Sequence, residues 1–142
     1  MKTVKTVSRY IFAVFFVAAG VMHFVRPGFY LKIMPPYVPL HLELVYLSGV
    51  CEIVLGAMLL VRRLAPLAGW GLILLLIAIF PANIYVYQHQ ELVPGTPILH
   101  LLRLPLQAFL ILWAYWYTRP DIRPAQPASA VASRSGRESS GA

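Results

Sequence analysis

Residues 42–61 read LELVYLSGVCEIVLGAMLLV, an apolar run of about 20 residues with Glu43 at its start and a second carboxylate, Glu52, near its middle. A helix of that length rises about 30 Å, which matches the hydrocarbon core of a bilayer. Glu52 would then lie about 15 Å deep, close to the midplane. This stretch therefore predicts a membrane-spanning helix that carries an acidic side chain inside the membrane.

Three further runs repeat the pattern, over about residues 7–25, 64–87 and 99–117. The chain of 142 residues is 59% hydrophobic and 12% charged, and the charged share is about half that of a soluble domain. Its 12 prolines and nine glycines are better tolerated in membrane helices than in soluble ones. We therefore expect an all-α integral membrane four-helix bundle over residues 1–117.

The formal charge of +7 does not indicate a nucleic-acid-binding protein, because the basic residues flank the apolar runs and form no groove-reading motif. Placing the N-terminus inside puts only Arg26 and Lys32 outside. The inside segments then hold Lys2, Lys5, Arg9, Arg62, Arg63, Arg119, Arg123, Arg134 and Arg137. The positive-inside rule thus favours both termini in the cytoplasm.

The two ends of the chain carry separate expectations. The basic residues before the first apolar run also fit a signal peptide with Ala18-Ala19-Gly20 as its cleavage site, although the apolar run continues beyond it. Residues 118–142 are rich in Pro, Ala, Ser and Arg and predict a disordered cytoplasmic tail.

The segment between the first two runs contains Pro27, Pro35, Pro36 and Pro39, which exclude one continuous helix. Its remaining residues are mostly apolar or aromatic. We expect this loop to lie on the membrane interface and to roof the outer end of the bundle.

Glu52 needs an explanation, because an ionisable side chain inside a bilayer is costly. Its helical neighbours Ser48, Gly49 and Gly56 are small, so this face is expected to pack against other helices. A functional carboxyl is one interpretation. The other is a hydrogen-bonded or protonated glutamate that only ties helices together.

Other polar residues fall at comparable depth. Asn83 follows Pro81, whose missing N–H is expected to kink the helix and free the carbonyl of Ile77. Side chains tilt toward the helix N-terminus, which brings His23 and Asn83 toward the level of Glu52. The predicted polar pocket, which opens toward the outside, is formed by His23, Glu52, Asn83, His100, Arg103 and Gln107.

The last three of these residues are three and four positions apart and share one helix face. Arg103 tilts away from Glu52, so that pairing is the weakest part of the prediction. Simpler interpretations exist: an interfacial role for His23, a plain kink at Asn83 and snorkelling for Arg103.

The sequence contains no complete catalytic constellation, so an enzymatic activity is not assigned. Cys51 is the single cysteine, which excludes an intramolecular disulfide and a dithiol site. His23, Glu52 and His100 offer metal-binding side chains, but they lack the spacing of a metal motif, and no metal is expected.

Several short motifs occur in an order and spacing that resemble the DoxX-like family of small membrane proteins. They are Gly20-x-x-His23-Phe24, Pro27, Pro35-Pro36-Tyr37-Val38-Pro39, Gly49-x-x-Glu52-x-x-x-Gly56, Phe80-Pro81-Ala82-Asn83 and Arg103-x-Pro105-x-Gln107. The resemblance covers roughly residues 8–117. It implies a four-helix bundle of the bacterial inner membrane, with relatives linked to quinone-dependent sulfur oxidation, to redox maturation of other proteins and, distantly, to receptor assembly.

Three functions follow as hypotheses. The first is a redox-associated accessory protein whose pocket binds a quinone or a similar amphipathic molecule. The second is a non-enzymatic assembly or stability factor for other membrane or redox proteins. The third is a proton-coupled carrier using Glu52, which would need a homo-oligomer because four spans are few. The absence of paired cysteines argues against direct thiol–disulfide chemistry.

Overall fold

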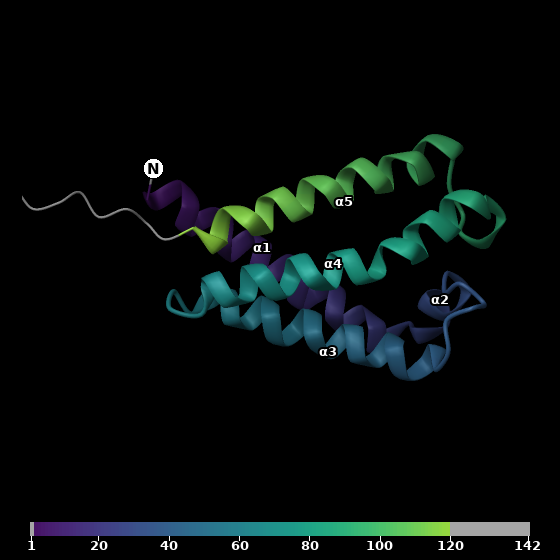
Figure 1. Ribbon diagram of the computed structural model, residues 1–142, viewed down its shortest axis with the longest axis horizontal. Helices are drawn as coiled ribbons and strands as arrows, with labels where there is room; N and C mark the ends of the chain where they lie inside the picture. The colour runs from purple at the N-terminus through teal and green to yellow at the C-terminus, as the bar shows by residue number, and fades with distance from the viewer. Residues whose placement is uncertain (1, 120–142) are drawn as a thin grey trace, which may run out of the picture.

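The computed structural model describes residues 2–119, which form α-helices and one short 3-10 helix (Figure 1). The helices are α1 (Lys2–Val25), α2 (Pro27–Lys32), α3 (His41–Leu60), α4 (Ala65–Gln88) and α5 (Pro97–Thr118), with the 3-10 helix η1 at Gln90–Leu92. The four long helices are long and apolar enough to cross a membrane, which confirms the predicted all-α architecture. Residues 120–142, most of the predicted tail, lie outside the described residues.

The helix ends agree with the predicted spans to within about three residues, except at the start of α1. That helix begins at Lys2, because the polar residues before the apolar run are helical as well. The loop after α1 contains the short helix α2, which the sequence does not predict. It begins at Pro27, a position where the missing N–H has no intrahelical partner to lose.

The long helices form two antiparallel hairpins (Figure 1). In the first, α1 packs along α3, and in the second, α4 packs along α5, while α3 and α4 join the two hairpins. The start of α1, the α3–α4 turn and the end of α5 lie at one end of the bundle. The opposite end carries α2 and η1, and we refer to it as the loop end.

Glycines allow α1 and α3 to cross at very short range. A Cβ atom added to Gly20 would lie 2.6 Å from the carbonyl oxygen of Gly49, and one added to Gly49 would lie 3.0 Å from that of Gly20. Gly56 similarly faces the carbonyl oxygen of Ala13 at 3.0 Å. The predicted packing of the face that carries Glu52 is therefore confirmed.

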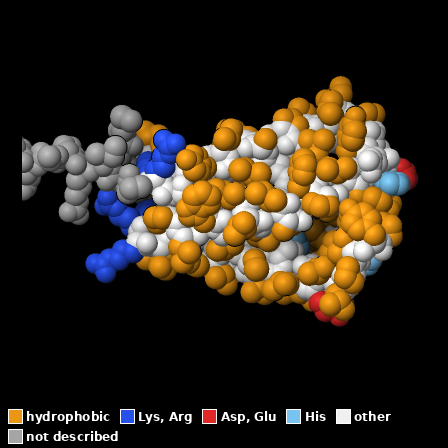
Figure 2. Space-filling view, viewed as in Figure 1, with side chains coloured by type: hydrophobic (Ala, Val, Ile, Leu, Met, Phe, Trp, Pro, Cys, Tyr) orange, Lys and Arg blue, Asp and Glu red, His pale blue; other side chains and the backbone are white. Residues whose placement is uncertain are grey.

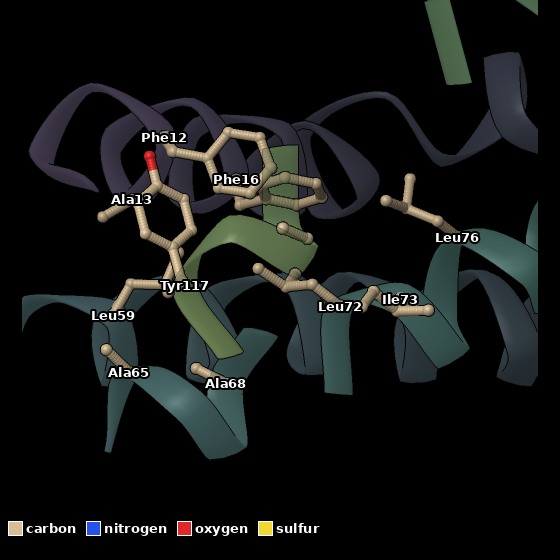
Figure 3. Packing of buried hydrophobic residues seen from close by; sticks show 11 residues of the cluster. Phe12, Ala13, Phe16, Leu59, Ala65, Ala68, Leu72, Ile73, Leu76 and Tyr117 are labelled. Carbon is tan, nitrogen blue, oxygen red and sulfur yellow. The ribbon is translucent and has the colours of Figure 1, made fainter. Parts of the chain in front are cut away.

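The hydrophobic core, whose side chains are drawn in Figure 3, lies toward the end of the bundle that carries the α3–α4 turn. Phe12 of α1 contacts the rings of Trp113 and Tyr117 of α5, with centroid distances of 4.6 and 5.6 Å. The Trp113 indole N–H donates to Ser8 Oγ at 2.7 Å, and the Ser8 and Tyr117 hydroxyls are also 2.7 Å apart. Large side chains thus join the hairpins here.

The outer surface of the bundle is apolar along its length, as a lipid-facing surface should be (Figure 2). Val14 is 66% exposed and Leu74 is 67% exposed although both lie within long helices. Lysine and arginine side chains gather at the end with the α3–α4 turn. Arg62 and Arg63 lie in the α3–α4 turn at that end, whereas Glu43 and Glu91 lie toward the loop end.

Candidate functional site

A cavity of about 480 Å³ lies at the loop end, between α3, α4 and the α1–α3 loop. Figure 2 shows a hollow on this side of the molecule, rimmed by hydrophobic side chains. Four of the six predicted site residues line the cavity, each from a different long helix: His23, Glu52, Asn83 and Arg103. The other two, His100 and Gln107, do not line it.

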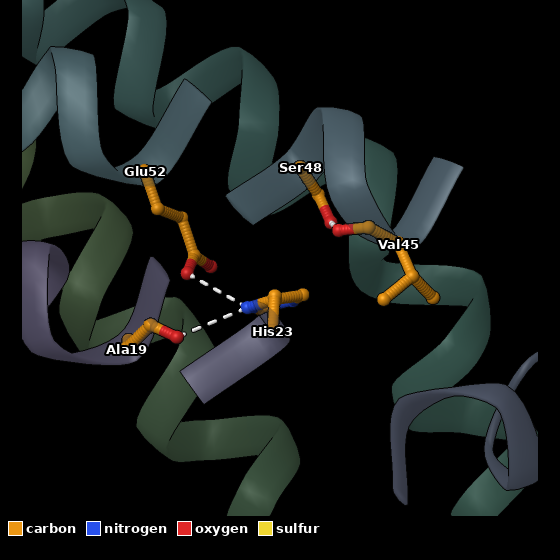
Figure 4. Close-up of polar contacts among 5 residues, drawn as sticks. All are labelled: Ala19, His23, Val45, Ser48 and Glu52. Atoms are coloured by element: carbon orange, nitrogen blue, oxygen red, sulfur yellow. Dashed lines mark hydrogen bonds and ion pairs between the residues drawn. The ribbon is translucent and has the colours of Figure 1, made fainter. Parts of the chain in front are cut away.

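His23 and Glu52 face each other across the α1–α3 crossing (Figure 4). His23 Nδ1 lies 3.4 Å from Glu52 Oε2 and 3.0 Å from the carbonyl oxygen of Ala19. A carbonyl oxygen can only accept, so this geometry assigns the hydrogen to Nδ1. Glu52 Oε2 has no hydrogen-bond partner within residues 2–119, so its contact with His23 is electrostatic. Glu52, which lines the cavity, keeps unused acceptor capacity there.

The loop between α1 and α3 covers this pair, as its composition predicts. Tyr30 of α2 stacks on His23 with ring centroids 3.7 Å apart and an interplanar angle of 21°. Burial raises the pKa of the Tyr30 phenol, and the nearby charge of Glu52 raises it further. His41 Nε2 lies 3.0 Å from the carbonyl oxygen of Pro35, which fastens the loop to the start of α3. We call this loop, residues 26–40, the roof.

Asn83 joins α4 to α5 behind the cavity. Its Nδ2 donates to Gln107 Oε1 at 2.7 Å, and the Gln107 amide donates in turn to the carbonyl of Leu76. The sequence predicts that the carbonyl of Ile77 is the one made available by Pro81. The carbonyl that Gln107 reaches is that of Leu76, which lies on the buried face of α4, whereas the Ile77 side chain is 55% exposed.

Arg103 lines the cavity as an unpaired cation. Within the described chain it has no hydrogen-bond or ion-pair partner, and it does not pair with Glu52. Because it has no partner there, the Arg103 guanidinium retains its donors for an anionic or oxygen-bearing group in the cavity. Pro105, two residues further along, lies inside α5, well beyond the first turn of that helix.

His100 is buried outside the cavity, one helical turn nearer the loop end than Arg103. It is 1% exposed, and neither ring nitrogen has a hydrogen-bond partner among residues 2–119. A Cβ on Gly95 would lie 3.3 Å from its Nε2, so the α4–α5 loop covers the ring. His100 and Arg103 are three residues apart in α5 and share a helix face, as predicted. His100 nevertheless does not line the cavity.

Four polar or reactive side chains line the cavity without having been predicted: Tyr30, Tyr37, Ser48 and Cys51. Ser48 Oγ donates to the carbonyl of Val45 at 2.9 Å and so is satisfied within its own helix. The sequence signal for Cys51 is its position beside Glu52. The signal for Tyr30 is an aromatic residue in a proline-bounded loop.

The remaining lining residues are apolar, so a limited set of polar groups interrupts a mostly hydrophobic wall. That set combines a carboxyl acceptor, guanidinium and amide donors, and an imidazole. It can hold an oxygen-bearing head group while the wall accommodates hydrocarbon. No group of three His, Cys, Asp or Glu residues within residues 2–119 is placed to hold a metal ion.

The fold and the four apolar helices define a multi-pass membrane protein. A family model described as "Domain of unknown function (DUF8561)" matches residues 12–118, so the chain belongs to this family. No curated protein and no solved structure matches the chain. The family match carries no DoxX assignment, so that resemblance stays a prediction.

Proposed function

We propose that this protein binds a small amphipathic molecule of the quinone class in its roofed cavity and acts as a redox-associated accessory protein of the membrane. One observation carries the proposal: four polar side chains from four long helices line one cavity whose remaining wall is mostly apolar. A volume of about 480 Å³ is within the range of small-molecule sites.

The polar lining groups suit the oxygens of a quinone ring. The Arg103 guanidinium and the second amide hydrogen of Asn83 are donors for a carbonyl oxygen. Glu52 is an acceptor for the hydroxyl of the reduced ring, and His23 lies beside it as a second proton-holding group. The apolar wall suits the attached hydrocarbon chain.

Binding can be tested with protein purified in mild detergent. Molecules extracted from it are identified by mass spectrometry, and titration with a prenylated quinone is followed by quenching of tryptophan fluorescence. We expect saturable binding that Arg103→Met weakens by roughly tenfold or more, because a charge-assisted donor is lost.

Arg119→Met is the matched control, because Arg119 lies beyond α5 at the other end of the bundle. Its affinity should equal that of the parent. Absence of both co-purified amphipathic molecules and saturable quenching would reject the proposed function.

A further inference from the structure

The spacing of α3 and α4 changes along their length. Toward the turn that joins them they touch: a Cβ on Gly71 would lie 2.5 Å from the Leu55 side chain. Leu59 of α3 and Leu72 of α4 are both fully buried in the core there. Toward the loop end the cavity separates the helices. Its wall is formed by Leu44, Leu47, Ser48 and Cys51 of α3 and by Leu75, Ala78, Ile79 and Ala82 of α4.

This part of the cavity reaches the outer surface of the bundle. Leu47 lines the cavity and is also 57% exposed, and Ala78 and Pro81 on the facing helix are lining and exposed as well. A side chain that is both lining and exposed marks an opening. The opening therefore lies on the flank between α3 and α4.

The depth of this flank places it within the hydrocarbon layer. Leu47 lies about 9 Å along α3 from the first residue of that helix, and Ala78 about 15 Å from the last residue of α4. Both helices are candidate membrane spans. A molecule at this opening would meet lipid chains before it met water.

The roof separates the same cavity from the aqueous side. The stacking of Tyr30 on His23 and the contact of His41 with Pro35 hold it down at two points. Pro35 is itself fully buried beneath the loop. Tyr37 of the roof also lines the cavity and is 73% exposed, so the roof closes the aqueous side only in part.

We propose that the cavity exchanges its ligand directly with the bilayer through this lateral opening between α3 and α4. The occupant is a membrane-dissolved molecule with one polar head and one hydrocarbon chain, and its identity as a quinone rests on the proposed function. The head lies against Glu52 and Arg103, while the chain leaves between Leu47 and Ala78. The roof would hinder the entry of a water-soluble ligand.

Cys51 supplies a test that needs no ligand, because it is the only cysteine and it lines the cavity. The full-length protein is reconstituted in phosphatidylcholine vesicles and treated with either an alkyl maleimide dissolved in the bilayer or a charged, water-soluble maleimide. We expect the alkyl reagent to label Cys51 at least about tenfold faster, because a charged group is disfavoured in an apolar passage.

Ala78→Trp places a bulky ring in the opening and should slow alkyl labelling by roughly tenfold, because the ring would fill the space through which the reagent passes. Ala57→Trp is the matched control: Ala57 is an exposed alanine of α3 that does not line the cavity. It should leave the rate unchanged. Leu74→Cys in a Cys51→Ala background, on the exposed surface of α4, shows that the alkyl reagent reaches the protein.

Three outcomes would overturn the lateral opening. They are faster labelling by the charged reagent, an Ala78→Trp rate equal to that of the parent, and an unreactive Cys51 while Leu74→Cys reacts. Since labelling does not depend on a bound molecule, a protein that fails to bind quinone but labels as expected would reject the proposed function and retain the lateral opening.

Discussion

Glu52 is buried on the crossing of α1 and α3, yet its Oε2 has no hydrogen bond within residues 2–119. His23 is close enough to attract it but does not complete a hydrogen bond. A buried carboxyl with incomplete partners destabilises a fold relative to a neutral group of the same shape. This arrangement suits a group whose partner is a ligand better than one that serves only to hold helices together.

Glu52→Gln distinguishes these two roles, because it keeps the shape and the hydrogen-bonding capacity but removes the charge and the titratable proton. We expect the variant to unfold at the same or a higher temperature than the parent, since an amide is less costly to bury. We also expect it to lose binding of the prenylated quinone. Stability is measured by thermal unfolding in detergent, and binding by fluorescence quenching.

A glutamine variant that is stable and binds the quinone as the parent does would contradict a functional carboxyl. Glu52 would then be a structural residue, and an assembly or stability factor would become the leading hypothesis. Glu52→Leu is not informative here, because it removes both roles together.

Gly20 gives a prediction about packing that is independent of function. Gly20→Ala introduces a Cβ atom 2.6 Å from a backbone oxygen of α3, and backbone cannot move aside as a flexible side chain can. We expect the free energy of unfolding to fall by about 1–3 kcal/mol. Denaturation in mixed detergent measures the change.

Gly28→Ala is the control for the same chemical change. Gly28 lies in α2, and a Cβ there would meet nothing within 4 Å. This variant should be as stable as the parent or slightly more stable, because alanine favours a helix more than glycine does. Equal losses in the two variants would mean that α1 and α3 do not approach closely at Gly20.

At the scale of elements, the pKa of the Tyr30 phenol reports whether the roof is docked on the bundle. Its pKa lies above the ordinary 10.0 because of burial first and the charge of Glu52 second. The folded protein therefore favours the neutral phenol. Its contribution to roof docking is complete below pH 10.0 and is lost as the pH rises through the raised pKa.

We expect the phenolate absorbance that Tyr30→Phe removes to titrate with a midpoint above 10.0 in the folded protein. In a Glu52→Gln background the midpoint should fall but remain above 10.0, because burial, the larger cause, persists. A midpoint at the ordinary value would show that the roof does not cover Tyr30 in solution.

The long helices could be predicted from the sequence because each apolar run has the length of a membrane span. The face that each helix buries was predictable only where small or polar residues mark it, as around Glu52 in α3. In α4 nearly every position is apolar, so nothing in the sequence distinguishes the buried Leu76 from the exposed Ile77. The sequence therefore does not show which carbonyl of α4 Gln107 reaches.

The site, like the buried helix faces, was predictable only where polar residues mark it. Depth and helix direction bring His23, Glu52 and Asn83 toward one level, and the structure places all three on one cavity. His100 differs because depth along α5 does not reveal that the α4–α5 loop folds over it. Tyr30 depends on α2, a helix too short to leave a clear hydrophobic period.

At the scale of the whole molecule, the unequal charge of its two ends gives a topology prediction. The end with the α3–α4 turn carries Arg9, Arg62 and Arg63, so we expect it to face the cytoplasm. Single cysteines at positions 62 and 98, each in a Cys51→Ala background, are labelled in intact cells with an impermeant maleimide. Position 98 should react and position 62 should react only after the membrane is opened.

Labelling of both positions from the same side would contradict a fold in which α4 separates them, and labelling of position 62 alone would reverse the orientation. The matched control is the Cys51→Ala chain without an added cysteine, which should remain unlabelled.

The division into two hairpins also bears on how the chain enters the membrane. His23 and Glu52 both belong to the α1–α3 hairpin, and Asn83 and Gln107 both belong to the α4–α5 hairpin. Each of these four polar groups thus has a partner in the same hairpin, which is synthesised within a short stretch of chain. The first hairpin can enter the bilayer with Glu52 and His23 already together, before the second has been synthesised. Inserting the chain hairpin by hairpin then keeps both pairs together as they leave water.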